Sequence, residues 1–444
     1  MGKCATRVAG WLGTWQPEEG DAALYGLSGL FALLVIAFSA TPLYRQWAEL
    51  AIGPYLAAAL LSAAVGARRR YRASHPVVGA AFPPVRHWST PRLALFMVVL
   101  FGAMLIPLCL EVAWRSDGDP SVHVQPEVSV VEQAGQRIVK GLNPYHASVR
   151  DGRPVSLVKG EPAYESFYPY LPLMTLFGLP SSLDAPLRLT DARIVFSGVT
   201  LLVVVLALSL MSASGERRIR TLQVLTVLPT AAMLLATGGD DMPIVAFLLL
   251  AMVLAQRRKP GWSGIVLGVV SAMKFTAWPL AVLALFAARD HSGKRAPGRM
   301  AIGILGVAGP VVTPFLILNP HVFIVNVILF PLGLSGVASP AQSPLPGYLL
   351  VSHFPVLHHV LPIAACALGG TVLVQRLIRR PPQGVADVTM LGGWVMLIAI
   401  LVAPATRIGY LIYPINFFVW GFMFRGLDRS ERIEPLAERS LQPV

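Results

Sequence analysis

Long apolar segments alternate with short polar ones along almost the whole chain. A membrane-spanning helix needs about 20 consecutive apolar residues. The segments that approach this length are 24–43, 50–66, 93–113, 194–212, 221–237, 243–255, 300–318, 354–374, 386–403 and 410–424. With two further apolar segments, 168–182 and 262–287, the pattern predicts an all-α, polytopic bundle of about 10–13 membrane helices, short re-entrant ones included.

The two further segments are predicted to enter the membrane without crossing it fully. Segment 168–182 contains three prolines, and each proline removes a backbone donor. Segment 262–287 is interpreted as a hairpin, with Lys274 near its turn and Pro279 breaking its second arm. Broken helices are tolerated in lipid only where they line a cavity or are buried in protein. These segments therefore point to a functional site.

Basic residues fall in short clusters between the apolar segments, at 68–72, 216–220, 256–259, 288–299, 375–380 and 424–432. The positive-inside rule assigns such clusters to the cytoplasmic side. By elimination, the opposite side carries the polar segments 114–166, 238–242, 319–348 and 404–409. We predict a multi-pass protein of the cell membrane whose site faces away from the cytoplasm.

Composition supports a membrane protein and excludes several other classes. The 444 residues are 55% hydrophobic and 13% charged, whereas soluble domains carry about 25% charged residues. The net charge of +13 does not indicate a nucleic-acid partner, because the basic residues lie in the clusters between helices. Cys4, Cys109 and Cys366 lie far apart and predict neither a disulfide framework nor a zinc site.

An amphipathic helix is predicted in the long outer segment. Apolar residues such as Val128 and Val131 recur there at helical spacing. Pro126 suits the first helical position and Gly141 the position just past the end. Glu127 would lie in the first turn, where an acid either stabilises the helix dipole without a catalytic role or belongs to a site.

Other charged residues occupy positions that a membrane helix bundle rarely tolerates without reason. Asp240 and Asp241 lie in a tight outer turn, TGGDDMP. They either line a polar site or cap the next helix. Lys274 lies inside an apolar segment, where it either snorkels or belongs to the site. Arg407 has no basic companions and is interpreted as an anion clamp.

Tyrosines flank the long outer segment and allow two interpretations. Tyr145 and Tyr168, with their neighbours, either stack on a sugar or form an aromatic belt at the membrane interface. Their positions, in the motifs GLNPY (141–145) and FYPYLP (167–172), are compatible with both.

The order of these features resembles a known family. An outer carboxylate precedes a Gly-x-x-Pro-Tyr turn, a Tyr-Pro-x-x-Pro motif follows, then an outer Gly-Asp turn, then RRKPGWSGIVLGVVSAMKFTAWP (257–279). This order is similar to the integral-membrane glycosyltransferases of the GT-C superfamily, most of all to the actinobacterial family 87 polyprenol-phosphate-mannose-dependent transferases. The resemblance covers roughly residues 93–425. Residues 1–92 are interpreted as an N-terminal extension with two membrane helices and a basic loop, and 426–444 as a cytoplasmic tail.

The resemblance implies a hexosyltransferase that uses a polyprenyl-monophosphate sugar, with mannose as the expected hexose. The acceptor would be a glycolipid, glycan or protein on the outer face, and the displacement would invert the sugar. Glu127 occupies the position of the family's catalytic aspartate and is the predicted base, with Val131 in place of a tyrosine. Asp117 and Asp119, just upstream, are reserve candidates.

The resemblance also implies roles for the other charges. Arg407 and Lys274 would hold the leaving phosphate, while Asp240 and Asp241 would line the site and could hold a divalent metal ion. No other cofactor is implied. The family's late outer motif ends in a His-His pair, whereas this chain has APATRIGY (403–410), with Arg407 in the gap. That departure weakens the inference that the hexose is mannose.

Two other classes remain open at this stage. A lipid or solute transporter, or a flippase without transferase activity, would also contain broken helices and buried charge. A non-catalytic scaffold would not need four charged positions on one face. The large outer segment 114–166 and the lack of a clear inverted repeat favour the enzyme. An enzyme also requires Glu127 and Arg407 to line one site.

Overall fold

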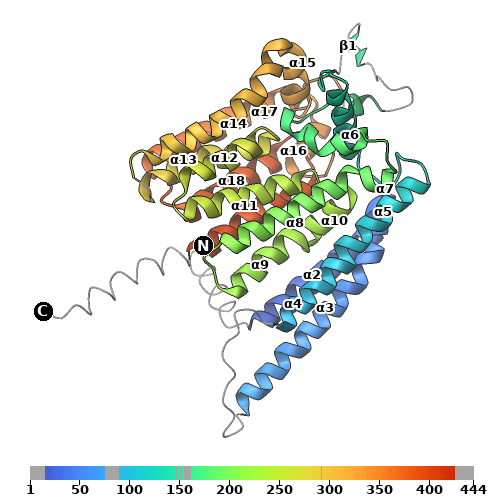
Figure 1. The fold of residues 1–444 in the computed structure, drawn as a ribbon, viewed down its shortest axis with the longest axis vertical. Helices are drawn as coiled ribbons and strands as arrows, with labels where there is room; N and C mark the ends of the chain where they lie inside the picture. The colour runs from blue at the N-terminus through green and yellow to red at the C-terminus, as the bar shows by residue number, and fades with distance from the viewer. Residues whose placement is uncertain are drawn as a thin grey trace, which may run out of the picture. The chain divides into compact units, whose positions relative to one another are not determined.

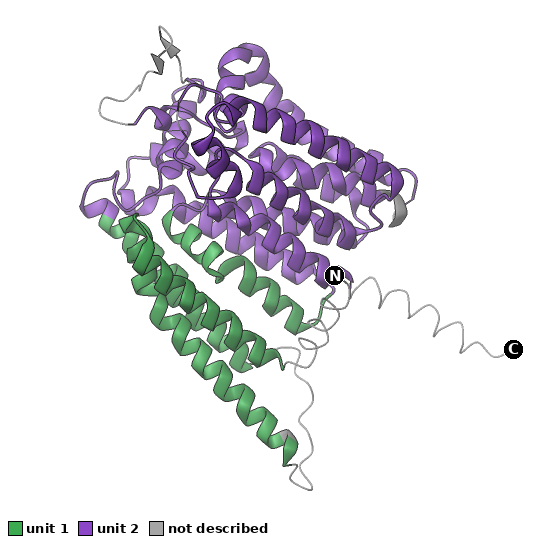
Figure 2. Cartoon of the chain, turned by 180° about the vertical axis from the view of Figure 1, so that it is seen from behind, with its two compact units in different colours: residues 1–114, 213–237 green, residues 115–212, 238–444 purple. Residues whose placement is uncertain are grey.

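The computed structural model of the chain describes residues 16–75, 90–146, 149–150, 153–154, 162–291, 293–337 and 339–425. The chain folds into two compact units, which Figures 1 and 2 show as ribbons. Unit 1 contains residues 1–114 and 213–237, and unit 2 contains residues 115–212 and 238–444. The predicted tail at 426–444 lies outside the described residues, and the predicted boundary at residue 92 stays a prediction.

The predicted all-α, multi-span class is confirmed. Among the described residues, seven helices are long and apolar enough to cross a membrane: 17–38, 42–72, 90–117, 187–210, 296–318, 357–379 and 385–402. The pair 215–226 and 229–237, bent by 48°, is an eighth candidate. Shorter apolar helices add 241–256, 260–271, 275–288 and 320–329. The only strands in the described part are the two-residue pair β1 (Val149–Arg150) and β2 (Arg153–Pro154).

Unit 1 is a helical bundle held by a buried ion pair. Its elements are α2 (Pro17–Phe38), α3 (Pro42–Ser74), α4 (Thr90–Leu100), the π-helix η1 (Phe101–Leu105), most of α5 (Ile106–Asp117), α9 (Gly215–Thr226) and α10 (Pro229–Thr237). Arg92 donates two hydrogen bonds to the Asp21 carboxylate, and the Gln223 amide donates a third. Bidentate hydrogen bonds between arginine and a carboxylate are among the strongest in proteins and offset the cost of burying both charges.

Unit 2 carries the long outer segment and the remaining helices. Its elements are α6 (Pro126–Val139), η2 (Ala163–Ser166), η3 (Pro172–Ser182), α7 (Leu187–Thr190), α8 (Ala192–Leu210), α11 (Asp241–Gln256), α12 (Pro260–Ser271), η4 (Phe275–Ala277), α13 (Trp278–His291), α14 (Ala296–Leu318), α15 (Pro320–Ile324), η5 (Val325–Leu329), α16 (Pro346–His353), α17 (Leu357–Arg379), α18 (Val385–Val402) and η6 (Ile408–Leu411). A further helix covers 412–425.

The two segments predicted to cross the membrane only in part contain short helices in unit 2, and their partial crossing stays a prediction. Segment 168–182 contains the 3-10 helix η3 in place of a spanning helix, because its prolines interrupt the α-helical ladder. Helices α12 and α13 form the predicted hairpin, with Lys274 in the turn. The interpretation of Pro279 as a breaker was wrong. Pro279 lies in the first turn of α13, where a missing N–H leaves no hydrogen bond unmade.

The predicted amphipathic helix is α6, and its bounds match the sequence signals. Pro126 begins it, and Gly141 follows its end with a φ of +70°. Its buried face packs directly on η3 through Gly135 and Gly178, where a Cβ on either glycine would overlap the other element's backbone. The pair of glycines thus fixes how closely the last turns of α6 approach η3.

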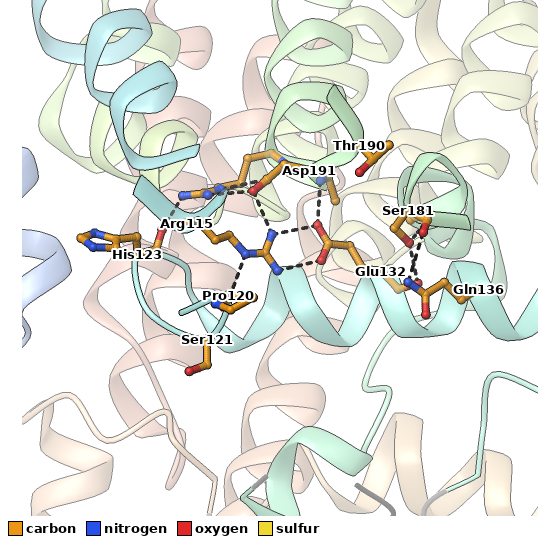
Figure 3. Close-up of polar contacts among 12 residues, drawn as sticks. Arg115, Pro120, Ser121, His123, Glu132, Gln136, Ser181, Thr190 and Asp191 are labelled. Carbon is orange, nitrogen blue, oxygen red and sulfur yellow. Dashed lines mark hydrogen bonds and ion pairs between the residues drawn. The ribbon is translucent and has the colours of Figure 1, made fainter. Parts of the chain in front are cut away.

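A buried charge network also anchors α6 (Figure 3). The Arg115 guanidinium donates to both carboxylate oxygens of Glu132 on α6, at 3.0 and 2.8 Å. The same guanidinium donates to Asp191 at 2.8 Å, and the backbone N–H of Ala192 donates to Glu132 at 3.0 Å. Asp191 also accepts from Arg193, so two cations balance two carboxylates. This network ties α6 to the beginning of α8.

Candidate functional site

Glu127 and Arg407 lie far apart in the sequence of unit 2 but form an ion pair in the structure. Arg407 Nη1 lies 2.6 Å from Glu127 Oε1, and each side chain is 19% exposed. Glu127 lies in the first turn of α6, and Arg407 directly precedes η6. The second carboxylate oxygen, Glu127 Oε2, is buried and has no hydrogen-bond partner among the described residues. One oxygen therefore faces a cation while the other remains able to accept a proton.

Lys274 bridges the two aspartates of the TGGDDMP turn. Its Nζ atom donates to Asp240 Oδ2 and to Asp241 Oδ1, both at 2.6 Å. The Tyr413 hydroxyl donates to the same oxygen of Asp241 and lies 2.6 Å from the Thr276 hydroxyl. All three charged side chains are about nine-tenths buried. The cluster holds two negative charges against one positive charge.

Two tyrosine rings lie beside the Lys274 cluster. Lys274 Nζ lies 5.2 Å from the ring centroid of Tyr170 and 5.7 Å from that of Tyr410, within reach of a cation–π interaction. The Tyr410 N–H donates to the carbonyl of Arg407 at 3.0 Å. Tyr410 thus contacts Lys274 through its ring and Arg407 through its backbone.

Backbone hydrogen bonds join the segment after Tyr170 to the turn that carries Lys274. The N–H groups of Leu171 and Leu173 donate to the carbonyls of Met273 and Ala272, both at 2.9 Å. The irregular chain before η3 therefore pairs with the turn that carries Lys274. This pairing satisfies backbone groups that would be costly to leave free in an apolar surrounding.

Tyr145 and Tyr168 lie in an aromatic cluster next to this region. Tyr145 is 2% exposed and Tyr168 is 1% exposed, and their ring centroids are 5.5 Å apart. The Tyr145 hydroxyl donates to the carbonyl of Tyr170 at 2.9 Å. A sugar would reach either ring only if neighbouring side chains moved, so substrate contact by these two tyrosines stays a prediction.

The reserve acids lie in different surroundings. Asp117 is 61% exposed and pairs with Arg188. Asp119 accepts two hydrogen bonds from Ser121, which hold the pKa of its carboxyl below the ordinary value. A carboxylate with a lowered pKa is a weaker base. Glu127 differs from both in being largely buried and in contacting Arg407, and its role as the base stays a prediction.

The possible metal site does not match the arrangement of the aspartates. In the part of the chain that the structure describes, no group of three or more His, Cys, Asp or Glu residues could hold a metal ion. The Lys274 ammonium occupies the space between Asp240 and Asp241. The two carboxylates therefore do not fit a divalent cation while Lys274 stays between them.

Tyr410, Tyr413 and Thr276 were not among the site residues predicted from the sequence. A signal was present for the tyrosines, since Tyr410 and Tyr413 are three residues apart, and such spacing places side chains on one helix face. Thr276 carries no signal of its own. It joins the cluster only because the α12–α13 hairpin brings it to Tyr413.

A pocket of about 450 Å³, lined by both polar and apolar residues, lies beside the loop that carries Arg407. Its polar lining comprises Ser339, Gln342, Tyr348, Ser352, His358 and His359, and Pro404 and Ala405 also line it. Thr406 pairs through its backbone with Ala341 and Ser343, at 2.8 and 2.9 Å, which fixes the loop against the pocket. Arg407 lies two residues after Ala405, which lines the pocket. Two residues span at most about 7–8 Å, so the Arg407 backbone lies within about that distance of the pocket.

Comparison with known proteins gives one family. The sequence model of glycosyltransferase family 87 matches residues 168–404, which is more than half of the 444-residue chain. The match includes Asp240, Asp241 and Lys274 and lies between Glu127 and Arg407 in the sequence. A search of curated proteins found no match.

Proposed function

Since the chain belongs to glycosyltransferase family 87, of the GT-C type with a lipid-linked sugar donor, we propose that it transfers a hexose from a polyprenyl monophosphate. The acceptor is a hydroxyl of a glycolipid, glycan or protein on the extracytoplasmic side. The observation that carries the proposal is the Glu127–Arg407 pair, which joins a base to an anion-binding group. A transporter needs no such pair beside a buried unpartnered carboxylate oxygen.

The proposed reaction is a single displacement at the anomeric carbon. The acceptor oxygen forms a bond to that carbon while the bond from carbon to the phosphate oxygen breaks, and the polyprenyl phosphate leaves with the electron pair. Glu127 takes the proton of the acceptor hydroxyl. Arg407 binds the phosphate, whose charge increases as the bond breaks. Attack from the face opposite the phosphate inverts the sugar, with mannose as the proposed hexose.

Arrival of the donor would change the partner of Arg407. A phosphate competes with Glu127 for the guanidinium, because Arg binds phosphate and carboxylate through the same planar fork. As the guanidinium turns to the phosphate, the Glu127 oxygen that it contacted becomes available to the acceptor hydroxyl. Donor binding would thus precede contact between Glu127 and the acceptor.

Lys274 is proposed to position the site more than to bind the donor. Its ammonium already satisfies two carboxylates, and a donor phosphate would have to share it. The Asp240–Lys274–Asp241 cluster instead fixes the turn before α11 against Tyr413 and Tyr410. Arg407, whose side chain is more exposed than that of Lys274, is the cation more easily redirected.

The transfer assay that tests this function also tests the side of the membrane. Right-side-out and inverted vesicles receive a water-soluble short-chain prenyl-phosphate [³H]mannose that does not cross the bilayer. We expect labelled product in right-side-out vesicles, with little in inverted ones. Activity restricted to inverted vesicles would reverse the proposed side. Uptake of intact donor without any transfer, in either orientation, would favour the transporter.

Arg407 is expected to govern donor binding. Hydrogen bonds to charged groups contribute about 1.5–3 kcal/mol, so Arg407→Ala should raise the Kd for a polyprenyl-phosphate donor about 10–100-fold. Arg407→Lys should recover the binding only in part, since a point charge lacks the planar fork. The measurement is donor binding in nanodiscs, and Arg188→Ala serves as a control at an exposed ion pair. An unchanged Kd in Arg407→Ala would remove Arg407 from the site.

We propose that the acceptor enters by the pocket beside Arg407. Its hydroxyl, amide and imidazole groups could bond sugar hydroxyls, its apolar side chains could cover a sugar face, and about 450 Å³ accommodates one or two sugar rings. Ser352→Trp should fill the pocket and raise the KM for the acceptor identified in the vesicle assay about tenfold or more, with the donor KM unchanged. Ser352→Ala is the matched control. An unchanged acceptor KM in Ser352→Trp would place the acceptor elsewhere.

A further inference from the structure

A second pocket, of about 560 Å³, lies where the beginnings of α12 and α14 meet. Its lining combines three basic side chains, Arg258, Lys259 and Arg299, with the apolar side chains of Trp262, Ile265 and Ile302. The tryptophan is 64% exposed and Ile302 is 73% exposed. Charge at one edge and an open apolar wall at the other match the two ends of a membrane lipid.

Glycines fix the geometry of this pocket. Helices α12 and α14 lie side by side (Figure 1). A Cβ on Gly264 would overlap the backbone of Met300, and one on Gly303 would overlap that of Gly264. Small residues at such contacts let membrane helices approach backbone to backbone. Arg299 lies one helical turn before Gly303, so the contact holds its side chain beside the start of α12.

The three cations have no acidic partner in the part of the chain that the structure describes. Arg258 also has a φ of +58°, a left-handed conformation that glycine adopts with less strain than arginine. A cation therefore occupies a position at the end of α11 that local backbone geometry disfavours. An anion that bound these three cations would offset their mutual repulsion.

We propose that this pocket binds an anionic phospholipid. The headgroup phosphate would lie among the three cations, and an acyl chain would follow Ile265 and Ile302. Basic pockets between membrane helices, with tryptophan at the interface, are suited to such headgroups. Helix α12 rises about 18 Å over its length, and Lys274 follows its far end. The lipid pocket is therefore separate from the proposed donor site and does not rest on the proposed reaction.

Quenching of tryptophan fluorescence by brominated lipid tests the proposal. The protein in nanodiscs is titrated with dibromo-phosphatidylglycerol or dibromo-phosphatidylcholine, and the Trp262→Phe variant identifies the signal of that residue. Cations near a membrane surface contribute about 1 kcal/mol each, so Trp262 should prefer the anionic lipid on the order of 10–100-fold. The triple variant Arg258→Gln, Lys259→Gln, Arg299→Gln should lose the preference.

The matched control removes three cations from another basic cluster, through Arg376→Gln, Arg379→Gln and Arg380→Gln. This control should keep the preference at Trp262. Equal quenching by the two lipids in the unaltered protein would overturn the proposal. Equal loss in both triple variants would show a general surface effect and would also overturn it. Displacement of the brominated lipid by stoichiometric undecaprenyl phosphate, with no displacement by excess phosphatidylglycerol, would assign the pocket to a different ligand.

Discussion

Glu127→Gln is expected to lower turnover by about 10²–10⁴-fold, with donor binding largely retained. The amide keeps the shape of the side chain, and its oxygen can still accept a hydrogen bond from Arg407. It cannot take the proton of the acceptor hydroxyl, so the chemical step loses its base. The measurement is single-turnover transfer from a radiolabelled polyprenyl-phosphate sugar in nanodiscs, together with the donor Kd in the same preparation.

Two comparisons separate catalysis from helix stability. Glu127→Asp should recover part of the rate, because it restores a carboxylate, although one methylene shorter and set on the same helix. A glutamate that only stabilised the helix dipole would contribute a few tenths to about 1 kcal/mol of stability, with little change in activity on substitution. Normal transfer by Glu127→Gln would defeat the assignment, and Asp117, Asp119 and Asp240 would then be tested in that order.

The parts of the fold that follow from local sequence could be predicted. Hydropathy predicts the spans because a bilayer leaves the backbone few alternatives to a helix. The bounds of α6 follow from Pro126 and Gly141, which act within one turn. Pro279 was misread, because a proline that begins a helix and one that breaks it differ only in where the helix starts.

The sequence allowed individual site residues to be predicted, but not most of the contacts between them. The cost of charge in a membrane drew attention to Asp240, Asp241, Lys274 and Arg407. The enzyme hypothesis placed Glu127 and Arg407 in one site, but the bonding of Lys274 to both aspartates could not be derived, because the two turns are distant in sequence. The sequence suggested Lys274 as a phosphate ligand, whereas its ammonium bonds both aspartates. The anchor of α6 through Glu132 was missed for the same reason.

The pairing of Arg407 with Glu127 favours the enzyme over the rival classes more than any single residue does. Sequence alone left the first-turn acid open to a role in the helix dipole. In the structure this acid has one oxygen on an arginine and one without a partner. A dipole role requires neither feature, whereas a displacement at a sugar phosphate uses both.

Lys274→Met is expected to destabilise the protein by about 3–5 kcal/mol, because it leaves two buried carboxylates without a cation. The triple variant Lys274→Met, Asp240→Asn, Asp241→Asn removes the charges together and should recover most of that stability. Thermal unfolding in detergent gives both values. Transfer activity should stay low in the triple variant if the cluster positions Tyr410 and Arg407, since neutral side chains cannot hold the turn in the same way. Equal stability of Lys274→Met and the unaltered protein would show that Lys274 does not neutralise the aspartates, and full activity in the triple variant would remove the cluster from the site.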